Sequence, residues 1–307
     1  MAAILYYWEC IIMSELPADF IGLQNKIDGL VKNYLDSHPD FIGMAMAKDP
    51  ALNGKTKDEV KKELASYPGA IAIAVHEEAH KLYNSGESLK RIQARQLSES
   101  AHSRTGIDIH PGTKIGDNFF VDHGTGGVIG ETAKIGKNTL MYHNVTLGAY
   151  GNPKDISHRH PEIGDYCTIS TGVDVLGHVK IGNNVKLNPH VKLQGNNITV
   201  GNKVAIGSSA QIADNNEIAD GIIIGTAAVI HKGVGRIEQN IPAYSHVLKE
   251  NGEFKIIRIE DTANRKDVET LADRFKKLTD RVLGNGRNHS NLRNLGHEEQ
   301  SRHSASL

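Results

Sequence analysis

Between Ile109 and Ile230 the chain repeats a six-residue pattern, in which one aliphatic side chain is followed by small and polar residues. A helix brings an apolar residue to one face about every 3.6 residues and a strand every two, so neither explains this period. A short strand followed by a corner does explain it, and three such units make one turn of a parallel β-helix. The sixth-position residues are Ile109, Ile115, Val121, Ile129, Ile135, Met141, Leu147, Ile163, Ile169, Val175, Ile181, Leu187, Leu193, Val200, Ile206, Ile212, Ile218, Ile224 and Ile230.

About nineteen such units predict roughly six turns, with the aliphatic side chains stacked inside the prism. We expect the Gly and Asn residues that follow many of them to adopt left-handed backbone at the corners. The predicted fold class is α+β, with an N-terminal α-helical domain, a left-handed parallel β-helix (hexapeptide repeat), and a C-terminal helix and disordered tail. A sandwich of short strands is the alternative, but its turns would recur irregularly, at intervals of about 8–12 residues.

Helical spacing of apolar residues dominates the chain before the repeat. It predicts helices over about 20–35, with Pro39 just beyond the end, from Thr56, from Pro68 to Tyr83, and over about 87–103. This region can cap the open end of the prism. The predicted domains are 1–13 as an N-terminal extension, 14–105 as the α-helical domain, 106–248 as the β-helix, and 249–307 as a C-terminal helix with a flexible tail.

The pattern changes again after the repeat. Asn240-Ile241-Pro242 is expected to break it, and a strand is expected over 254–259. A helix then begins near Asp261 or Thr262. Its apolar seam is suited either to a coiled coil between copies of a trimer or to packing on the flank of its own prism, and consists of Val268, Leu271, Phe275, Leu278 and Val282.

The composition of the chain argues against several classes of function. The 307 residues carry a formal net charge of −1, so we expect no long-range electrostatic attraction to nucleic acid or to an anionic membrane. The two cysteines, Cys10 and Cys167, are too few for a disulfide framework and favour a reducing cytoplasm. The apolar start MAAILYYWECII contains Glu9 and has no basic segment before it. We therefore expect neither a signal peptide nor a membrane span there.

Two interruptions of the repeat are candidate functional positions, because solenoid proteins carry function in such insertions. Eight residues, rather than six, separate Val121 from Ile129, and the excursion GAYGNPKDISHRHPE follows Leu147. His123 lies in the first interruption, and Asp108 lies fifteen residues earlier. On a turn of about eighteen residues, this spacing predicts the two on adjacent turns near one corner, within hydrogen-bond reach. A histidine oriented by a carboxylate is suited to act as a general base.

A family resemblance rests on motifs in and before the repeat. Upstream are DPA at 49–51 and YPGAIAIAVHEEAHKLYNSG at 67–86; within the repeat are TGIDIHPG (105–112), DHGTG (122–126), VIGETA (128–133), VTLG (145–148) and RHPEIGD (159–165). In this order the motifs closely resemble the serine O-acetyltransferase family, over roughly residues 45–193. They are more specific than the hexads, which many acyltransferases share.

The resemblance implies an enzyme of cysteine biosynthesis that moves the acetyl group of acetyl-CoA to the hydroxyl of L-serine. His123 would take the hydroxyl proton and Asp108 would orient the imidazole. The serine ammonium group would meet Asp49 and Asp122, and its carboxylate would meet Arg159 with His160; Ala149, Thr171 and Pro189 are the residues expected to contact CoA.

The resemblance also implies partners. We expect a homotrimer with active sites between prisms, a dimer of trimers being the alternative, and cysteine as a feedback inhibitor. No metal is expected. Because the chain ends in Ser-Ala-Ser-Leu307 rather than in the isoleucine usual for the family, we expect weak or no complex with O-acetylserine sulfhydrylase. Alternatives are acetylation of another hydroxyl, such as that of homoserine or a sugar, a zinc site like that of γ-carbonic anhydrases, and a non-catalytic scaffold.

Overall fold

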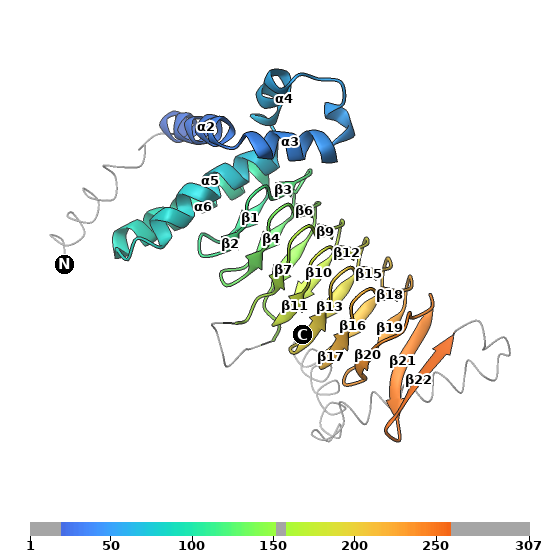
Figure 1. Ribbon diagram of the computed structural model, residues 1–307. Coiled ribbons are helices and arrows are strands. Elements are labelled where there is room, and N and C mark those ends of the chain that lie inside the picture. The colour runs from blue at the N-terminus through green and yellow to red at the C-terminus, as the bar shows by residue number, and fades with distance from the viewer. Residues whose placement is uncertain (1–19, 152–157, 259–307) are drawn as a thin grey trace, which may run out of the picture. The chain divides into compact units, whose positions relative to one another are not determined.

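The computed structural model describes residues 20–151 and 158–258 (Figure 1). The predicted N-terminal extension, the predicted helix beginning near Asp261 or Thr262, and the terminal Leu307 lie outside the described residues. Among the helices of the described part, none is long and apolar enough to cross a membrane.

Helices precede the first strand of the repeat. They are α2 (Phe20–Ser37), α3 (Pro39–Lys48), the 3-10 helix η1 (Pro50–Leu52), α4 (Lys57–Leu64), α5 (Pro68–Tyr83) and α6 (Ser88–Thr105). Helices α2, α4, α5 and α6 lie where apolar spacing predicted helices. Helix α3 is not among the predicted helices, because Pro39 indicates only the end of the preceding helix. Proline also suits the first turn of a helix, where its missing N–H is not needed.

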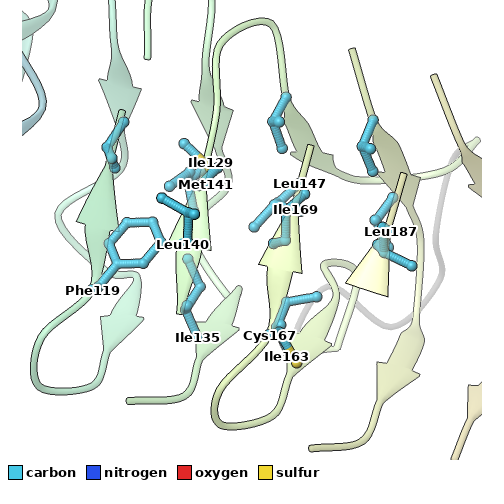
Figure 2. Close-up of a cluster of buried hydrophobic side chains, with 14 of the residues drawn as sticks. Phe119, Ile129, Ile135, Leu140, Met141, Leu147, Ile163, Cys167, Ile169 and Leu187 are labelled. Atoms are coloured by element: carbon cyan, nitrogen blue, oxygen red, sulfur yellow. The ribbon is translucent and has the colours of Figure 1, made fainter. Parts of the chain in front are cut away.

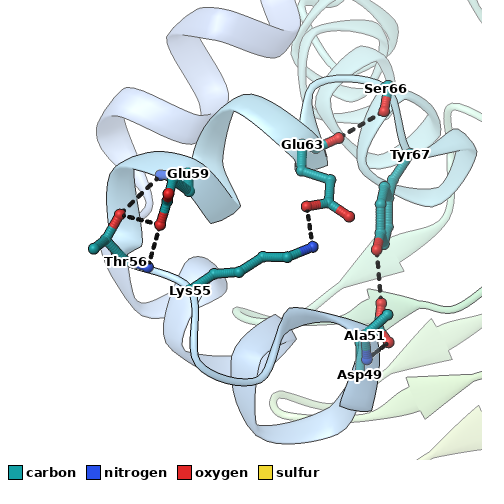
Figure 3. Close-up of polar contacts among 8 residues, drawn as sticks. All are labelled: Asp49, Ala51, Lys55, Thr56, Glu59, Glu63, Ser66 and Tyr67. Atoms are coloured by element: carbon teal, nitrogen blue, oxygen red, sulfur yellow. Dashed lines mark hydrogen bonds and ion pairs between the residues drawn. The ribbon is translucent and has the colours of Figure 1, made fainter.

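Local capping explains where two of the predicted helices begin and end. The Thr56 hydroxyl accepts the Glu59 backbone N–H at 3.3 Å, and Oε2 of Glu59 accepts the Thr56 backbone N–H at 2.8 Å, which completes a capping box before α4 (Figure 3). Helix α6 ends at Gly106, whose φ of 71° is the left-handed conformation that glycine adopts at low cost. The chain then enters the first strand.

Short strands of three parallel sheets make up the repeat, and each turn contributes one strand to each sheet. Sheet A has nine strands: β1 (Asp108–Ile109), β4 (Val128–Ile129), β7 (Thr146–Gly148), β10 (Asp174–Leu176), β13 (Lys192–Gln194), β16 (Gln211–Ala213), β19 (Val229–Ile230), β21 (Ser245–Glu250) and β22 (Glu253–Arg258). Sheet B has seven: β2 (Lys114–Ile115), β5 (Lys134–Ile135), β8 (Glu162–Ile163), β11 (Val179–Ile181), β14 (Ile198–Val200), β17 (Asn216–Ile218) and β20 (Gly235–Ile237). Sheet C has six: β3 (Phe120–Val121), β6 (Leu140–Met141), β9 (Thr168–Ile169), β12 (Lys186–Leu187), β15 (Ala205–Ile206) and β18 (Ile223–Ile224).

The predicted hexapeptide-repeat β-helix is confirmed. Every predicted sixth-position residue lies in one of these strands, and all of them except Ile115 are buried. Ile129 is in register with Ile109 on one side and with Leu147 on the other, so side chains stack from turn to turn inside the prism (Figure 2). Burying one such side chain stabilises the fold by about 1.5–3 kcal/mol.

The glycine that follows the aliphatic residue has a different purpose from the predicted one. Gly116 and Gly136 are not in the left-handed region. A β-carbon on Gly116 would lie 2.7 Å from the Lys137 backbone nitrogen, so glycine is needed because the next turn passes too close for a side chain. The left-handed corner residues come two positions later, at Asn118 and Asn138, both with φ of 56°.

The repeat also continues further than predicted. Strand β20 pairs with β17, and Ile241 forms a parallel bridge with Ile224, so the expected break at Asn240-Ile241-Pro242 is wrong. Ile241 is buried and extends the ladder of sheet C. Strand β22 falls close to the strand expected over 254–259, and it forms an antiparallel hairpin with β21. The turn residues Asn251 and Gly252 have φ of 52° and 87°, as an Asn-Gly hairpin requires.

The helices pack on the first turn of the prism. Helices α3 and α5 both contact β3, and α6 contacts β1. The Phe41 ring of α3 meets Phe120 of β3 edge to face at 5.8 Å. This packing brings the C-terminal end of α3 and the N-terminal end of α5 to the corner that follows β3.

Candidate active site

Asp122, His123 and Gly124 form the corner between β3 and β4. His123 has a φ of 61° and Gly124 a φ of 74°, so the backbone turns sharply here. A β-carbon on Gly124 would lie 2.5 Å from Cδ1 of Ile107, which shows how closely this corner packs on the chain just before β1. The imidazole of His123 projects outward and its side chain is 76% exposed. It is therefore accessible to a substrate.

A carboxylate lies next to this imidazole. Oδ1 of Asp122 is 3.8 Å from Nε2 of His123. Burial raises the pKa of Asp122; His123 opposes that shift and Asp49 adds to it. Asp49 and Asp122 are therefore close enough to influence each other, although they come from α3 and from the prism. The predicted ammonium-binding pair is brought together.

Asp49 is held on both carboxylate oxygens. It caps η1, where Oδ1 accepts the Ala51 backbone N–H at 2.8 Å, and Oδ2 accepts the Tyr67 hydroxyl at 2.8 Å (Figure 3). The Asp49 residue is only 8% exposed. Tyr67 begins the motif at 67–86, and the sequence alone predicts no role for it.

The corners that lead into the strands of sheet A form a column, which we call the entry corner. His123 precedes β4, and His143, Thr171 and Pro189 precede β7, β10 and β13. The His143 ring lies 6.1 Å from the His123 ring in a T-shaped arrangement, and its Nε2 is 2.8 Å from Oγ1 of Thr171. Thr171 and Pro189 therefore continue the column that begins at His123.

Arg159 and His160 lie elsewhere, in the column of residues that follow the sheet A strands, which we call the exit corner. Nη2 of Arg159 donates to Oε2 of Glu131 at 2.8 Å, and the Tyr83 hydroxyl of α5 donates to Oε1 at 2.7 Å. The Tyr83 hydrogen bond is the main reason that the pKa of Glu131 is lowered, with the Arg159 charge adding to it. Glu131 belongs to the motif at 128–133, and the sequence alone predicts no role for it.

His160 is a buried, neutral imidazole. Its Nδ1 accepts the Thr132 backbone N–H at 3.1 Å and lies 2.9 Å from the Thr132 hydroxyl. Gly130 makes room for the ring, since a β-carbon there would lie 2.1 Å from Nε2 of His160. Burial lowers the pKa of His160 to about 4, so it is uncharged at neutral pH.

The predicted hydrogen bond between Asp108 and His123 is not formed within the chain. Both residues are described, and they lie on adjacent turns, but no hydrogen bond joins their side chains. The left-handed backbone at His123 directs its imidazole outward from the wall, and its nearest carboxylate is Asp122. Asp108 instead lies close enough to His110 to affect its pKa.

The predicted site residues thus form two groups within one chain. Asp49, Asp122, His123, Thr171 and Pro189 lie at the entry corner. Arg159, His160 and the exposed Ala149 lie at the exit corner. The strands are parallel, so one face of the prism separates the groups, a span on the order of 15–20 Å.

Helix α5 also carries the spacing of a zinc-binding helix, HEEAH at 76–80. Nδ1 of His80 is 2.8 Å from the Pro111 carbonyl oxygen. His76 is buried, and burial lowers its pKa to about 3. Over residues 20–151 and 158–258 no group of three or more His, Cys, Asp or Glu side chains is arranged to hold a metal ion.

Solved structures resemble the chain over part of its length. They include Entamoeba histolytica serine acetyltransferase 1 in complex with L-cysteine, 39% identical with a TM-score of 0.48 over 57% of this chain and 62% of that chain. The native form of that protein is 36% identical, with a TM-score of 0.46 over 58% of this chain and 67% of that chain.

Sequence comparison finds relatives over part of the chain. The model of the bacterial transferase hexapeptide (six repeats) matches residues 160–195. The serine acetyltransferase of Staphylococcus aureus (strain Mu50) is 44% identical over 145 residues, 47% of this chain. The chain spans 63% of the length of that curated relative. With the repeat confirmed in the fold, the chain resembles hexapeptide-repeat transferases over this region, and the curated relatives that it matches are named serine acetyltransferases.

Proposed function

We propose that this protein transfers the acetyl group of acetyl-CoA to the hydroxyl of L-serine, giving O-acetylserine and CoA in cysteine biosynthesis. The observation that carries the proposal is the entry corner, where the exposed imidazole of His123 lies beside the Asp122 carboxylate, which in turn is close enough to Asp49 for the charge of Asp49 to raise the pKa of Asp122. A base beside one carboxylate, with a second carboxylate near the first, suits an acceptor that carries an ammonium group close to its hydroxyl. The name of the Staphylococcus aureus relative supports the same reaction.

His123 acts as the general base in this proposal. Its imidazole takes the proton from the serine hydroxyl as the oxygen attacks the thioester carbonyl of acetyl-CoA. The carbon–sulfur bond then breaks, and the CoA thiolate takes the proton from the imidazolium. General bases of this kind contribute about 10²–10⁴ in rate. Asp122 is close enough to stabilise the imidazolium that forms.

Asp108 keeps its proposed orienting role from the family resemblance. The imidazole would have to turn from its position beside Asp122 to accept that role, because the two side chains are not hydrogen bonded in the chain alone. Substrate binding would favour such a turn, because the serine ammonium group competes for the Asp122 carboxylate.

Arg159 would bind the serine carboxylate through its guanidinium group, and His160 would contribute a neutral N–H. In one chain these residues lie a full prism face away from His123, too far for one serine molecule to touch both. We therefore propose a homotrimer in which the exit corner of one copy meets the entry corner of the next. Three such contacts close about one axis and complete three sites. A dimer of trimers would contain the same sites.

Acetyl-CoA would lie along the same junction between copies. Thr171 and Pro189 continue the entry column away from His123, in the direction that an extended pantetheine chain would follow. Ala149 would contribute from the exit corner of the adjacent copy. Cysteine has the ammonium and carboxylate groups of serine, so we expect it to compete for the serine pocket. We propose the cytoplasm as the location of the protein, because a chain with only two cysteine residues is typical of a reducing compartment.

An acceptor panel tests the proposal. Thiol release from acetyl-CoA would be followed with L-serine, homoserine and a galactoside, on the wild-type protein and on His123→Ala. We expect turnover with serine that is lost in His123→Ala while the assembly stays intact by light scattering. Greater turnover with homoserine or the galactoside would show that serine is not the preferred acceptor. Metal-dependent CO₂ hydration without acetyl transfer would show that the protein is not an acetyltransferase.

A further inference from the structure

Tyr67 links the helical region to the candidate ammonium pocket. Its hydroxyl donates to Oδ2 of Asp49 at 2.8 Å, and the Ala51 backbone N–H donates to Oδ1 at 2.8 Å (Figure 3). The carboxylate is therefore clamped from both sides, with one bond from α5 and one from η1. Because Asp49 is almost fully buried, the loss of either bond would leave an oxygen without a donor.

The start of α5, where Tyr67 is the N-cap residue, has a fixed place on the prism. A β-carbon on Gly69 would lie 2.1 Å from the carbonyl oxygen of Val121, so this end of the helix touches the end of β3 directly. Val121 immediately precedes Asp122. Tyr67 is therefore hydrogen bonded to the carboxylate contributed by the helices and lies close enough to the carboxylate contributed by the prism to be affected by its charge.

The phenol is well suited to act as a permanent donor. Burial raises the pKa of Tyr67 well above its ordinary value, with the hydrogen bond to Asp49 adding to the shift and the charge of Asp122 contributing less. The hydroxyl therefore stays protonated throughout the neutral pH range. It also spreads the charge of Asp49, which reduces the repulsion between the two carboxylates while the pocket is empty.

We propose that Tyr67 is a positioning residue that sets the preference of the enzyme for acceptors bearing an ammonium group. Its hydroxyl fixes the orientation of the Asp49 carboxylate, which lies close enough to Asp122 for the two charges to influence each other. The inference rests on the proposed function, since it concerns recognition of the amino group of that substrate. It assigns no step of acetyl transfer to Tyr67.

The test compares two acceptors that differ only in the amino group, L-serine and 3-hydroxypropanoate. Tyr67→Phe keeps the ring and removes the hydroxyl. Since a hydrogen bond to a charged group is lost, we expect the KM for serine to rise by about tenfold or more. The kcat/KM for 3-hydroxypropanoate and the KM for acetyl-CoA should change less than about twofold. Tyr34→Phe, which alters a buried tyrosine of α2 outside the site, is the matched control and should leave both acceptors unaffected.

A double-mutant cycle separates positioning from general destabilisation. Asp49→Asn should weaken serine binding at least as much as Tyr67→Phe, and the double variant should be little worse than Asp49→Asn alone. A purely structural role for Tyr67 would instead make the losses add and would affect both acceptors equally. Either of those results, or an unchanged serine KM in Tyr67→Phe, would overturn the inference.

A second measurement does not depend on the folding of Tyr67→Phe. Trifluorotyrosine incorporated at position 67 keeps the ring and lowers the pKa of the phenol, and a phenolate cannot donate to Asp49. The serine KM of the substituted enzyme should therefore begin to rise at a lower pH than that of the unmodified enzyme, in which only the serine ammonium group loses its proton. Superimposable pH profiles would count against the inference. If wild-type protein does not acetylate serine at all, the proposed function itself fails, and that outcome is distinct from these.

Discussion

Replacing Gly130 by alanine tests how the exit corner holds His160. A β-carbon at this position would lie 2.1 Å from Nε2 and 2.2 Å from Cδ2 of His160, far inside van der Waals contact. Gly130 is not among the glycines with left-handed backbone, so the substitution introduces the steric conflict without backbone strain. The imidazole would have to leave its place against the corner that follows β4.

The magnitude follows from the contacts that His160 would lose. Its Nδ1 accepts the Thr132 backbone N–H at 3.1 Å and lies 2.9 Å from the Thr132 hydroxyl. At about 0.5–1.5 kcal/mol for each hydrogen bond, Gly130→Ala should lower the free energy of unfolding by about 1–3 kcal/mol. The pKa of His160, now about 4 because the ring is buried, should rise toward the ordinary value of about 6.5 once the ring reaches solvent.

Urea unfolding followed by circular dichroism, at one protein concentration, measures the stability, and NMR titration of the imidazole measures the pKa. The matched control is the same substitution in a His160→Ala background, where the β-carbon meets no ring. There Gly130→Ala should cost less than about 0.5 kcal/mol. If the substitution costs the same in both backgrounds, or if the pKa of His160 does not move, Gly130 does not serve to seat this ring.

Three further predictions concern the chemistry and its pH dependence. His123→Ala should lower kcat by about 10²–10⁴-fold in a correctly assembled protein, and near-normal turnover would remove the proposed base. Arg159→Ala should raise the serine KM by about tenfold while the KM for acetyl-CoA changes little, and an equal rise in both would indicate a collapsed exit corner instead. Because burial holds the pKa of His160 near 4 and that of His76 near 3, the unfolded chain binds more protons than the folded one as pH falls below about 6.5. The free energy of unfolding should therefore decline from about pH 6.5 to pH 4, and a flat profile would contradict these two assignments.

The repeat could be predicted almost completely from the sequence because its signal is repeated on every turn. Its end is predicted too early, because Asn240-Ile241-Pro242 indicates a break, whereas Ile241 still pairs with Ile224. The hairpin of β21 and β22 had a local signal in Asn251-Gly252 that was not used. Helix α3 has only ten residues, and the proline that starts it was interpreted as a stop.

The candidate site was only partly predictable for a different reason. Motifs supplied the identity of His123 and Arg159, but only the alternation of parallel strands and corners reveals that the two lie at opposite edges of sheet A. The spacing of Asp108 and His123 gave adjacent turns without giving the direction of the imidazole, which depends on the left-handed corner. Tyr67 was not found because its partner Asp49 lies eighteen residues away, beyond a helix whose packing fixes the contact.

The most direct test of the account is complementation between His123→Ala and Arg159→Ala, assayed at limiting serine. Under these conditions His123→Ala alone should be nearly inactive, and Arg159→Ala alone should keep about a tenth of the wild-type rate. If each site takes His123 from one copy and Arg159 from the next, trimers assembled at random from equal amounts contain intact sites in about one quarter of positions. Coexpression of the two variants, or joint refolding of them, should therefore restore about a quarter of the wild-type rate. A mixture no more active than its separate components would contradict a site built between copies.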